Sequence, residues 1–267
     1  MLKPILTAVI GFLCTGAQAE TRIGICYRAD AAPFSYVGTD GQPAGYSIDI
    51  CRAAAEMLGR SPVMVEVKSN DRFDMLGTQR ACDMLCEATS ITMKRRESLE
   101  FSLITFLTGT ALLYPSDLLE YETGGQSITV GYLRGTTIAD HSRAGTLIGG
   151  QLADFTFKPF DDHEAAASAL AAGTIDSYIA DREILQEIVN KNAALLQTHR
   201  VSRESITYEP YAIAVRMGSD EIRIALDRVL VQMFRSGTIA GLLARHVPDR
   251  QFDPMLDSLF AIQSLPE

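Results

Sequence analysis

The sequence lacks the motifs that mark several enzyme classes. It contains no G-x-S-x-G, no H-E-x-x-H, no P-loop and no C-x-x-C, and its four histidines are not beside an obvious nucleophile. Low-complexity tracts and internal repeats are also missing. Basic charge is scarce, with 24 Lys and Arg against 33 Asp and Glu, which disfavours nucleic-acid binding. These absences argue against catalysis, and we expect neither a cofactor nor a bound metal.

Long apolar runs are absent beyond the N-terminus. Residues 1–19 combine one lysine, an apolar core and the small-residue site Ala17-Gln18-Ala19. This pattern predicts a cleavable secretory signal peptide, whose apolar run is too short to span a membrane permanently. Cys14 follows Leu13 rather than a small residue, so no lipoprotein anchor is expected. The mature chain, with 23 basic and 33 acidic residues and a net charge of −10, is expected to be exported and soluble.

Four cysteines remain after the signal peptide: Cys26, Cys51, Cys82 and Cys86. An even number in an oxidising compartment predicts two disulfides, for which three connectivities exist. If the segment from Cys82 to Cys86 is extended, their Cα atoms lie ~13 Å apart, too far for a direct bridge. Each of these two is therefore expected to pair with Cys26 or Cys51, and which pairs with which is left open.

The order of the predicted elements indicates an α/β fold. Strands are expected at 22–28, 63–67, 84–85, 109–114, 130–133, 175–180 and 211–216. Helices are expected at 50–58, 72–80, 182–191 and 219–237, after residues 161–164, and last at 238–246, before a proline. Asp40-Gly41 predicts a tight hairpin. Strand-helix-strand-helix-strand order near the N-terminus is typical of a doubly wound lobe.

The stretch 82–102 carries the most specific chemical signal. An apolar pair is followed by the hydroxyl residues Thr89, Ser90 and Thr92, and then by three cations that include Arg95. A guanidinium binds both oxygens of a carboxylate, and hydroxyls with helix N-terminal N–H groups can complete the cage. The pattern predicts a carboxylate clamp, and the alternative is a solvated basic turn.

These residues resemble the signature of the bacterial extracellular solute-binding proteins, family 3, which are periplasmic amino-acid-binding proteins. The matching elements are Thr89-Ser90-Ile91-Thr92, Arg95 and Phe101-Ser102. The resemblance implies a bilobal periplasmic-binding-protein fold, with two doubly wound lobes joined by two crossing strands. The first lobe would comprise residues 20–110 and 212–267, and the second residues 111–211. It also implies a periplasmic monomer that delivers an amino acid to a membrane ABC permease.

The resemblance carries residue roles onto this chain. Arg95 would bind the α-carboxylate of the ligand, helped by Ser90 and by the backbone at Ala88 and Ser90. Thr137 would add a donor from the second lobe. Asp181 would bind the ammonium group, although a cap on the helix 182–191 would also explain this residue. Closure of the lobes would then depend on bound ligand, because closure without ligand would bury unpaired charges.

The choice of amino acid depends on Arg28. The run from Tyr27 to Tyr36 resembles the glutamate/aspartate-binding branch of the family, where an arginine contacts the side-chain carboxylate of the ligand. The alternative for Arg28 is a surface residue at a strand end. Two departures stand against this branch: Ala31 replaces an aromatic residue, and Glu87 places a negative charge in the clamp strand.

Three further alternatives stay open. Periplasmic dehydratases of cyclic acids share this fold, and Glu87 could serve there as a general acid. A soluble sensor that docks on a kinase ectodomain would have the same ligand site as a transport protein. The acidic run at 161–164 could bind a metal, although acidic residues are expected capping at a helix start.

Overall fold

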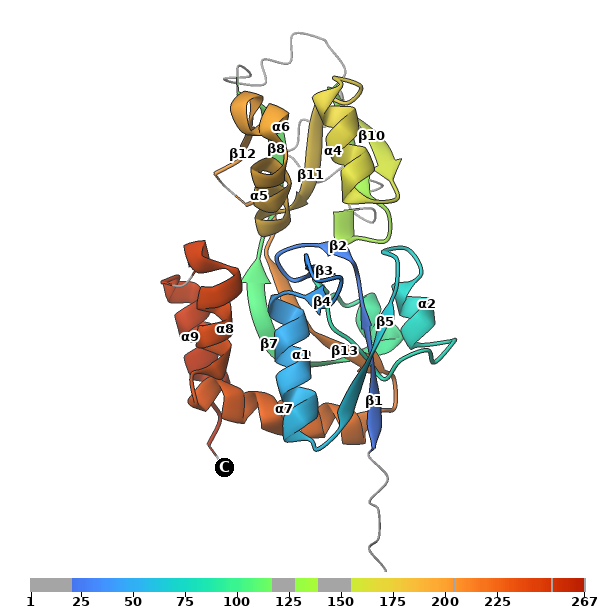
Figure 1. Cartoon of the computed structure of the whole chain (residues 1–267), viewed down its shortest axis with the longest axis vertical. Helices are drawn as coiled ribbons and strands as arrows, with labels where there is room; N and C mark the ends of the chain where they lie inside the picture. The colour runs from blue at the N-terminus through green and yellow to red at the C-terminus, as the bar shows by residue number, and fades with distance from the viewer. Residues whose placement is uncertain (1–20, 117–127, 139–154, 204, 251, 267) are drawn as a thin grey trace, which may run out of the picture.

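The computed structural model describes residues 21–116, 128–138, 155–203, 205–250 and 252–266. The predicted signal peptide lies outside these residues. The described elements form two α/β units along the long axis of the molecule, each built around its own sheet (Figure 1).

The lower unit in Figure 1 contains, among the described residues, a five-stranded sheet of order β5-β1-β6-β13-β7. Its strands are β1 (Arg22–Tyr27), β5 (Ser61–Glu66), β6 (Met84–Leu85), β7 (Leu99–Thr108) and β13 (Glu209–Arg216). Strand β1 pairs in parallel with β5 and β6, whereas β13 runs antiparallel to β6 and β7. Helices α1 (Tyr46–Met57) and α2 (Arg72–Leu76) supply the crossovers between the parallel strands.

The upper unit in Figure 1 contains, within the same described part of the chain, a sheet of order β10-β9-β11-β8-β12. Its strands are β8 (Thr110–Pro115), β9 (Ile128–Leu133), β10 (Phe155–Phe160), β11 (Ser177–Asp181) and β12 (His199–Val201). Strands β10, β9 and β11 are parallel, and β8 is antiparallel to β11 and β12. Helices α4 (His163–Ala171), α5 (Arg182–Lys191) and α6 (Ala193–Thr198) accompany this sheet.

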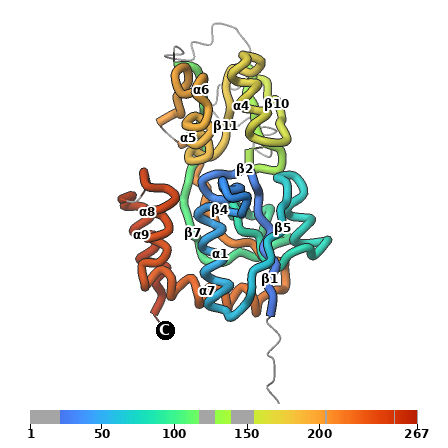
Figure 2. Tube along the Cα trace, in the orientation of Figure 1, coloured from blue at the N-terminus to red at the C-terminus, as the bar shows by residue number. Residues whose placement is uncertain are grey.

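The chain crosses between the two sheets twice (Figure 2). The first crossing runs from β7 to β8 through the single residue Gly109, and the return runs from β12 to β13. A Cβ atom on Gly109 would lie 2.4 Å from Ser205 Oγ and 2.6 Å from the carbonyl oxygen of Thr207, so only glycine fits where the crossings touch. The fold is therefore the expected bilobal one, and the lobe boundaries at 110/111 and 211/212 stay a prediction.

Three helix predictions differ from the structure, the first being α2, which ends at Leu76 rather than at residue 80. Helix α1 begins at Tyr46 rather than at residue 50, because Gly45 adopts a φ of 125° that turns the chain directly into the helix. The prediction that the last helix is 238–246 is wrong, since α8 (Thr238–His246) is followed by η3 (Pro248–Arg250) and α9 (Pro254–Gln263). An Asp-Pro start explains α9: the Asp253 carboxylate accepts hydrogen bonds from two backbone N–H groups of the first turn.

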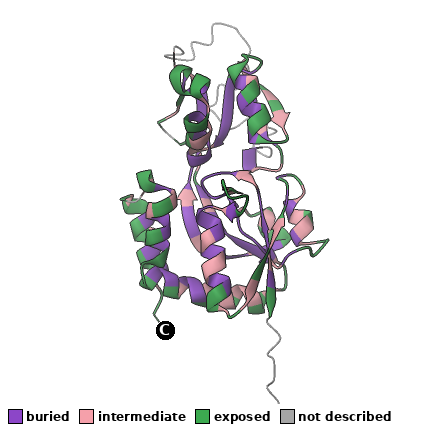
Figure 3. Cartoon of the chain, viewed as in Figure 1, coloured by how far each residue is buried: buried purple, intermediate pink, exposed green. Residues whose placement is uncertain are grey.

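The remaining elements complete the first lobe. Strands β2 (Asp30–Ala31), β3 (Ser35–Val37) and β4 (Pro43–Ala44) form a small sheet at the predicted Asp-Gly hairpin. Helix α7 (Asp220–Arg235) packs with α1, α8 and α9 around the principal apolar core. Figure 3 shows the strands of both sheets largely buried and the outer helix faces exposed.

Two disulfides cross-link the first lobe. Cys26 pairs with Cys82, whose Cα atoms are 5.6 Å apart, and Cys51 pairs with Cys86, whose Cα atoms are 6.3 Å apart. The prediction of two disulfides without a Cys82–Cys86 bridge is thereby confirmed. Both bonds anchor β6, the strand that leads into the predicted clamp.

Candidate functional site

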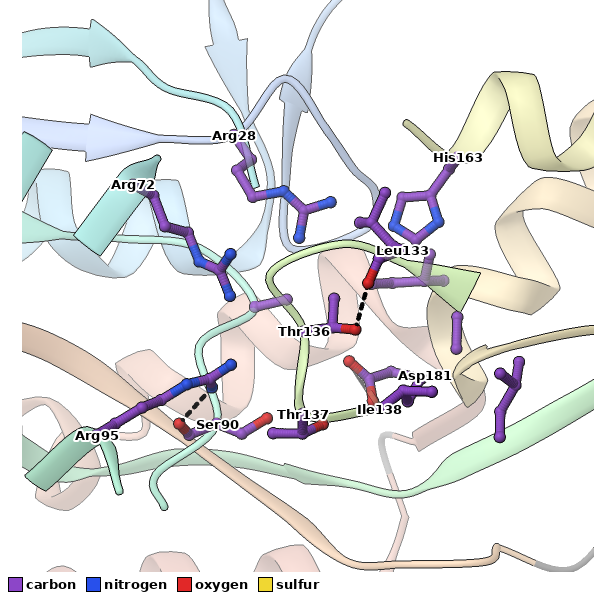
Figure 4. Close-up of a pocket in the computed structure, with 14 residues that line it drawn as sticks. Arg28, Arg72, Ser90, Arg95, Leu133, Thr136, Thr137, Ile138, His163 and Asp181 are labelled. Atoms are coloured by element: carbon purple, nitrogen blue, oxygen red, sulfur yellow. Dashed lines mark hydrogen bonds between the residues drawn. The ribbon is translucent and has the colours of Figure 1, made fainter. Parts of the chain in front are cut away.

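A cavity lies between the two sheets, beside the carboxyl ends of β1, β6, β9 and β11 (Figure 4). Its volume is about 20 Å³, which is room for about one water molecule, so the two lobes are closed on each other. All six predicted ligand residues line it: Arg28, Ala88, Ser90, Arg95, Thr137 and Asp181. The structure thus brings together residues that are up to 153 positions apart in the chain, and their roles in binding stay a prediction.

Arg95 and Ser90 face each other at one end of the cavity. Arg95 Nη1 donates a hydrogen bond to the Ser90 carbonyl oxygen at 2.7 Å, which fixes the guanidinium beside the Ser90 backbone. Its Nη2 lies 3.5 Å from the carbonyl oxygen of Gly135, which belongs to the opposite lobe. The guanidinium carbon also lies 4.8 Å from the ring centroid of Phe73. These contacts hold the cation at the meeting edge of the lobes.

Arg28 and Arg72 form a second cationic group in the same cavity (Figure 4). Both side chains are buried, with 2% and 1% of their surface exposed. Arg28 Nη2 lies 2.8 Å from Asp30 Oδ1, and Arg72 Nε lies 2.7 Å from Glu87 Oε1. Burial disfavours the charge of Arg28, but the carboxylates of Asp30 and Glu87 outweigh it and raise its pKa. Arg28 is therefore not the surface residue considered as its alternative.

Glu87 lies behind these arginines and is not among the residues that line the cavity. Its side chain is fully buried, and it contacts Arg28 as well as Arg72 while accepting a hydrogen bond from Thr89 Oγ1 at 2.6 Å. Burial lowers the pKa of Arg72 to about 10, against the opposing effect of Glu87. The expected repulsion between Glu87 and an acidic ligand required that it face the cleft, which it does not.

Asp181 supplies the carboxylate on the other side of the cavity. It occupies the N-cap position of α5, but its side chain makes no capping hydrogen bond and instead accepts one from the Tyr211 hydroxyl of the first sheet. Burial, helped by the nearby charge of Glu209, raises the pKa of Asp181 to about 7. Helix capping, the alternative for this residue, is therefore not what its carboxylate does.

Thr137 and His163 complete the face from the second lobe (Figure 4). Thr137 Oγ1 donates to Glu209 Oε1 across the lobes at 3.3 Å. His163 Nδ1 lies 2.8 Å from the Tyr178 hydroxyl, and burial lowers the pKa of this imidazole to about 3, so it is neutral at neutral pH. His163 Nε2 is buried and has no hydrogen-bond partner among the described residues. Such an orphaned polar atom beside a cavity suits a ligand group.

Two titratable residues that line the cavity, Arg72 and His163, were not among the predicted ligand residues. The sequence marks Arg72 only as the start of a helix, because its ion-pair partner, Glu87, lies 15 positions away. His163 stands out in the sequence only as a member of the acidic run at 161–164. There Asp162 caps α4 as predicted, accepting from the Ala165 N–H at 2.7 Å. Among the described residues, no group of three or more metal-ligating side chains lies together.

The comparisons with known proteins place this architecture in a family. The sequence profile of the bacterial extracellular solute-binding proteins, family 3, matches residues 23–249. The ABC transporter glutamine-binding protein GlnH of Bacillus subtilis is 26% identical over 204 residues, covering 74% of this chain and 71% of the relative.

Two solved structures share the fold. An ancestral arginine-binding protein bound to glutamine superposes with a TM-score of 0.74 at 22% identity, over 85% of this chain and 98% of the other. An ancestral amino acid-binding protein, a precursor of cyclohexadienyl dehydratase, gives 0.71 at 23% identity, over 84% and 95%. No helix in the described ranges is long and apolar enough to cross a membrane. The fold and the profile define a bilobal solute-binding protein, and the chain belongs to the bacterial extracellular solute-binding proteins, family 3.

Proposed function

We propose that the protein captures an acidic L-amino acid, glutamate or aspartate, between its lobes and delivers it to an ABC permease without turning it over. One observation carries this proposal: three arginines, Arg28, Arg72 and Arg95, line the same cavity as the carboxylate of Asp181. An acidic amino acid brings two carboxylates and one ammonium group, which is the complementary set of charges.

The positions of the charges divide the ligand into two ends. Arg95, beside Ser90 at one end of the cavity, would bind the α-carboxylate, and Asp181 would bind the α-ammonium group. Arg28 lies farthest from Arg95 and Arg72 lies between the two (Figure 4), so the side-chain carboxylate of the ligand would reach Arg28 and Arg72. His163 Nε2, on the facing lobe, would gain its missing hydrogen-bond partner from the same ligand.

A neutral or basic ligand fits this set less well. A glutamine side chain would leave the Arg28 and Arg72 end without an anion, and hydrogen bonds between two charged groups are about twice as strong as neutral ones. A lysine or arginine side chain would place a third cation beside two buried guanidinium groups. The like-charge repulsion would be on the order of several kcal/mol.

Closure explains how binding would be signalled. The cavity of about 20 Å³ is too small for an amino acid, so the lobes must open for entry and adjust on binding. In the closed form, Asp181 and Thr137 already form hydrogen bonds with Tyr211 and Glu209 of strand β13, which belongs to the first sheet. A ligand that supplies its own charges at these points would shift the population of closed protein, the form that a permease recognises.

The test is a calorimetric titration of the mature protein with glutamate, aspartate, glutamine, arginine and cystine. Glutamate or aspartate should bind at least about tenfold more tightly than the others, which corresponds to about 1.4 kcal/mol. Tighter binding of a neutral or basic amino acid would overturn the acidic ligand but leave amino-acid capture standing. Absence of any α-amino-acid binding below millimolar concentration would overturn both.

Catalysis is not part of the proposal. The dehydratase alternative depended on Glu87 as a general acid, and Glu87 does not line the cavity but is held in ion pairs behind it. Incubation with a cyclic acid substrate should therefore give no product, and product formation would revive that alternative.

Periplasmic localisation and the permease complete the proposal. The two disulfides suit an oxidising compartment, and the family consists of extracellular solute-binding proteins. Cell fractionation should recover the protein in the periplasm, shortened by residues 1–19. Stimulation of permease ATPase activity in liposomes by the liganded protein would support transport. Stimulation of a kinase ectodomain instead would support the sensor alternative.

A further inference from the structure

We infer that Glu87 is a positioning residue that sets how much negative charge the cleft accepts on the ligand side chain, an inference that rests on the proposed capture of an amino acid here. Glu87 does not line the cavity, yet the two buried arginines that it joins both do. It would therefore act on the ligand through Arg28 and Arg72 rather than by contact.

The geometry fixes this carboxylate firmly. Oε1 lies 2.7 Å from Arg72 Nε and accepts the Thr89 hydroxyl at 2.6 Å, while Oε2 accepts from Arg28 Nη1 at 3.5 Å. The main-chain oxygen of Glu87 accepts a hydrogen bond from Ser47 Oγ at 3.1 Å. Two guanidinium groups repel each other, and a carboxylate between them holds both in place side by side.

Burial makes this charge count more than that of its neighbour Asp30. Asp30 also contacts Arg28, at 2.8 Å, but its side chain is 32% exposed, whereas that of Glu87 is 0% exposed. Water screens an exposed charge far more than a buried one. Glu87 therefore holds the combined charge of the Arg28–Arg72 end at a level that suits a singly charged carboxylate. Loss of its charge would favour a ligand side chain with two negative charges.

Two amino acids separate charge from shape in the test. O-phospho-L-serine and L-homocysteate both have about the chain length of glutamate and end in a tetrahedral oxyanion. At pH 8 the phosphate is doubly charged, because its second pKa is about 6, and the sulfonate is singly charged. The ratio of their affinities, measured by calorimetry, reports the charge that the site accepts, and a general loosening of the site would weaken both ligands alike.

The Glu87→Gln substitution should raise the ratio of phosphoserine affinity to homocysteate affinity about tenfold or more. Asp30→Asn is the matched control, because it removes one charge from the same arginine at a more solvated position, and it should raise the ratio less. Thr89→Val, which removes a hydrogen bond from Glu87 without changing charge, should leave the ratio unchanged.

Glu87→Gln leaves Arg72 buried without its partner, which can prevent folding. The same comparison can therefore be made between Arg72→Gln and the double variant Arg72→Gln/Glu87→Gln. The second substitution again removes one negative charge, so the ratio should rise about tenfold between these two variants. The double variant has the net charge of the natural protein, and its ratio should return close to that of the natural protein.

A ratio that stays within about twofold after loss of Glu87, or that rises as much with Asp30→Asn, overturns the inference. If the natural protein binds glutamate and the ratio does not change, only the role of Glu87 fails. If the natural protein binds neutral amino acids but none of glutamate, aspartate, phosphoserine and homocysteate, the acidic ligand and the role of Glu87 fail together.

Discussion

The two sides of the cleft are built differently. The first lobe contributes three cations, Arg28, Arg72 and Arg95, and carries two disulfides that anchor the strand leading to the clamp. The second lobe contributes Asp181, with a hydroxyl and a neutral imidazole beside it. Within the described residues, that lobe has no disulfide and its site is held by hydrogen bonds.

This difference suggests a division of work. Binding of two carboxylates is helped by guanidinium groups held at a fixed spacing. In the first lobe, the disulfides and the buried ion pairs provide this fixed spacing. The second lobe must instead approach and leave, so its polar groups need partners that a ligand can replace. Asp181 and Thr137 have such partners in Tyr211 and Glu209, which lie on β13 in the first sheet. The first side would select the ligand, and the second would report its presence.

The largest expected effect tests the first side at Arg95. Arg95→Ala should weaken ligand binding by about 2–5 kcal/mol, because the α-carboxylate would be buried without its counter-ion. Arg96→Ala is the matched control: Arg96 is exposed, lies over the Phe101 ring and does not line the cavity. Calorimetry should show near-normal binding for the control. Equal losses in both variants would contradict the assignment of the clamp to Arg95.

A second experiment removes the cross-linking that distinguishes the first side. Replacing Cys51 and Cys86 by serine should lower the free energy of unfolding by about 2–4 kcal/mol, since the bridge closes a loop of 35 residues. Denaturant titration measures this loss.

In the natural protein, thiol labelling should require prior reduction. Labelling of the four cysteines without reductant would show that the disulfides are not formed.

The third experiment reverses the charge at Arg28. Arg28→Asp should invert the preference from glutamate or aspartate to lysine or arginine, and glutamate should lose roughly 2 kcal/mol or more. Arg28→Gln is the matched control and should weaken acidic ligands without creating a preference for basic ones. Competition assays measure the ranking. An unchanged ranking in Arg28→Asp would remove Arg28 from the side-chain end of the site.

The sequence predicted much of the fold because its signals are local. Alternation, glycine turns and capping residues give the strands and helices their places, and the spacing of Cys82 and Cys86 excludes their direct bridge. The Asp253-Pro254 start of α9 is an equally local signal, which the predicted helices do not include. The order of the strands within each sheet depends on long-range pairing, such as β13 between β6 and β7, which no local pattern specifies.

The site was predictable only where a contiguous motif carries it. Ser90 and Arg95 belong to one stretch, whereas Arg72, in helix α2, is held at the cavity by its pairing with Glu87, a residue from a different segment. The direction of the Glu87 side chain decides whether its charge opposes or supports an acidic ligand. Alternation in a strand does not give that direction, because Glu87 lies beyond the end of β6 at Leu85.

The last comparison concerns protons, and it tests the second side through Asp181. Its pKa of about 7 in the folded protein exceeds the unfolded value of about 3.9. Between these values the folded protein holds a proton that the unfolded chain has lost. Stability without ligand should therefore fall as the pH rises from about 4 to about 7. Asp181→Asn, which cannot ionise, should stabilise the ligand-free protein at pH 8 but not at pH 4.

Ligand binding should have the opposite dependence on pH. An ammonium group favours the ionised form of Asp181, so binding below pH 7 must expel the proton. Affinity should then fall by up to about tenfold per pH unit from pH 7 to pH 5, where a glutamate ligand with a side-chain pKa of about 4.3 stays charged. Asp181→Asn should bind weakly at pH 8 and lose this slope, whereas Asp162→Asn, at the exposed cap of α4, should keep it. The assignment would be contradicted if the affinity of the natural protein did not change across this pH range, or if Asp181→Asn kept the slope. Asp181 would then not be the group that binds the ammonium, and the second lobe would lose its proposed role.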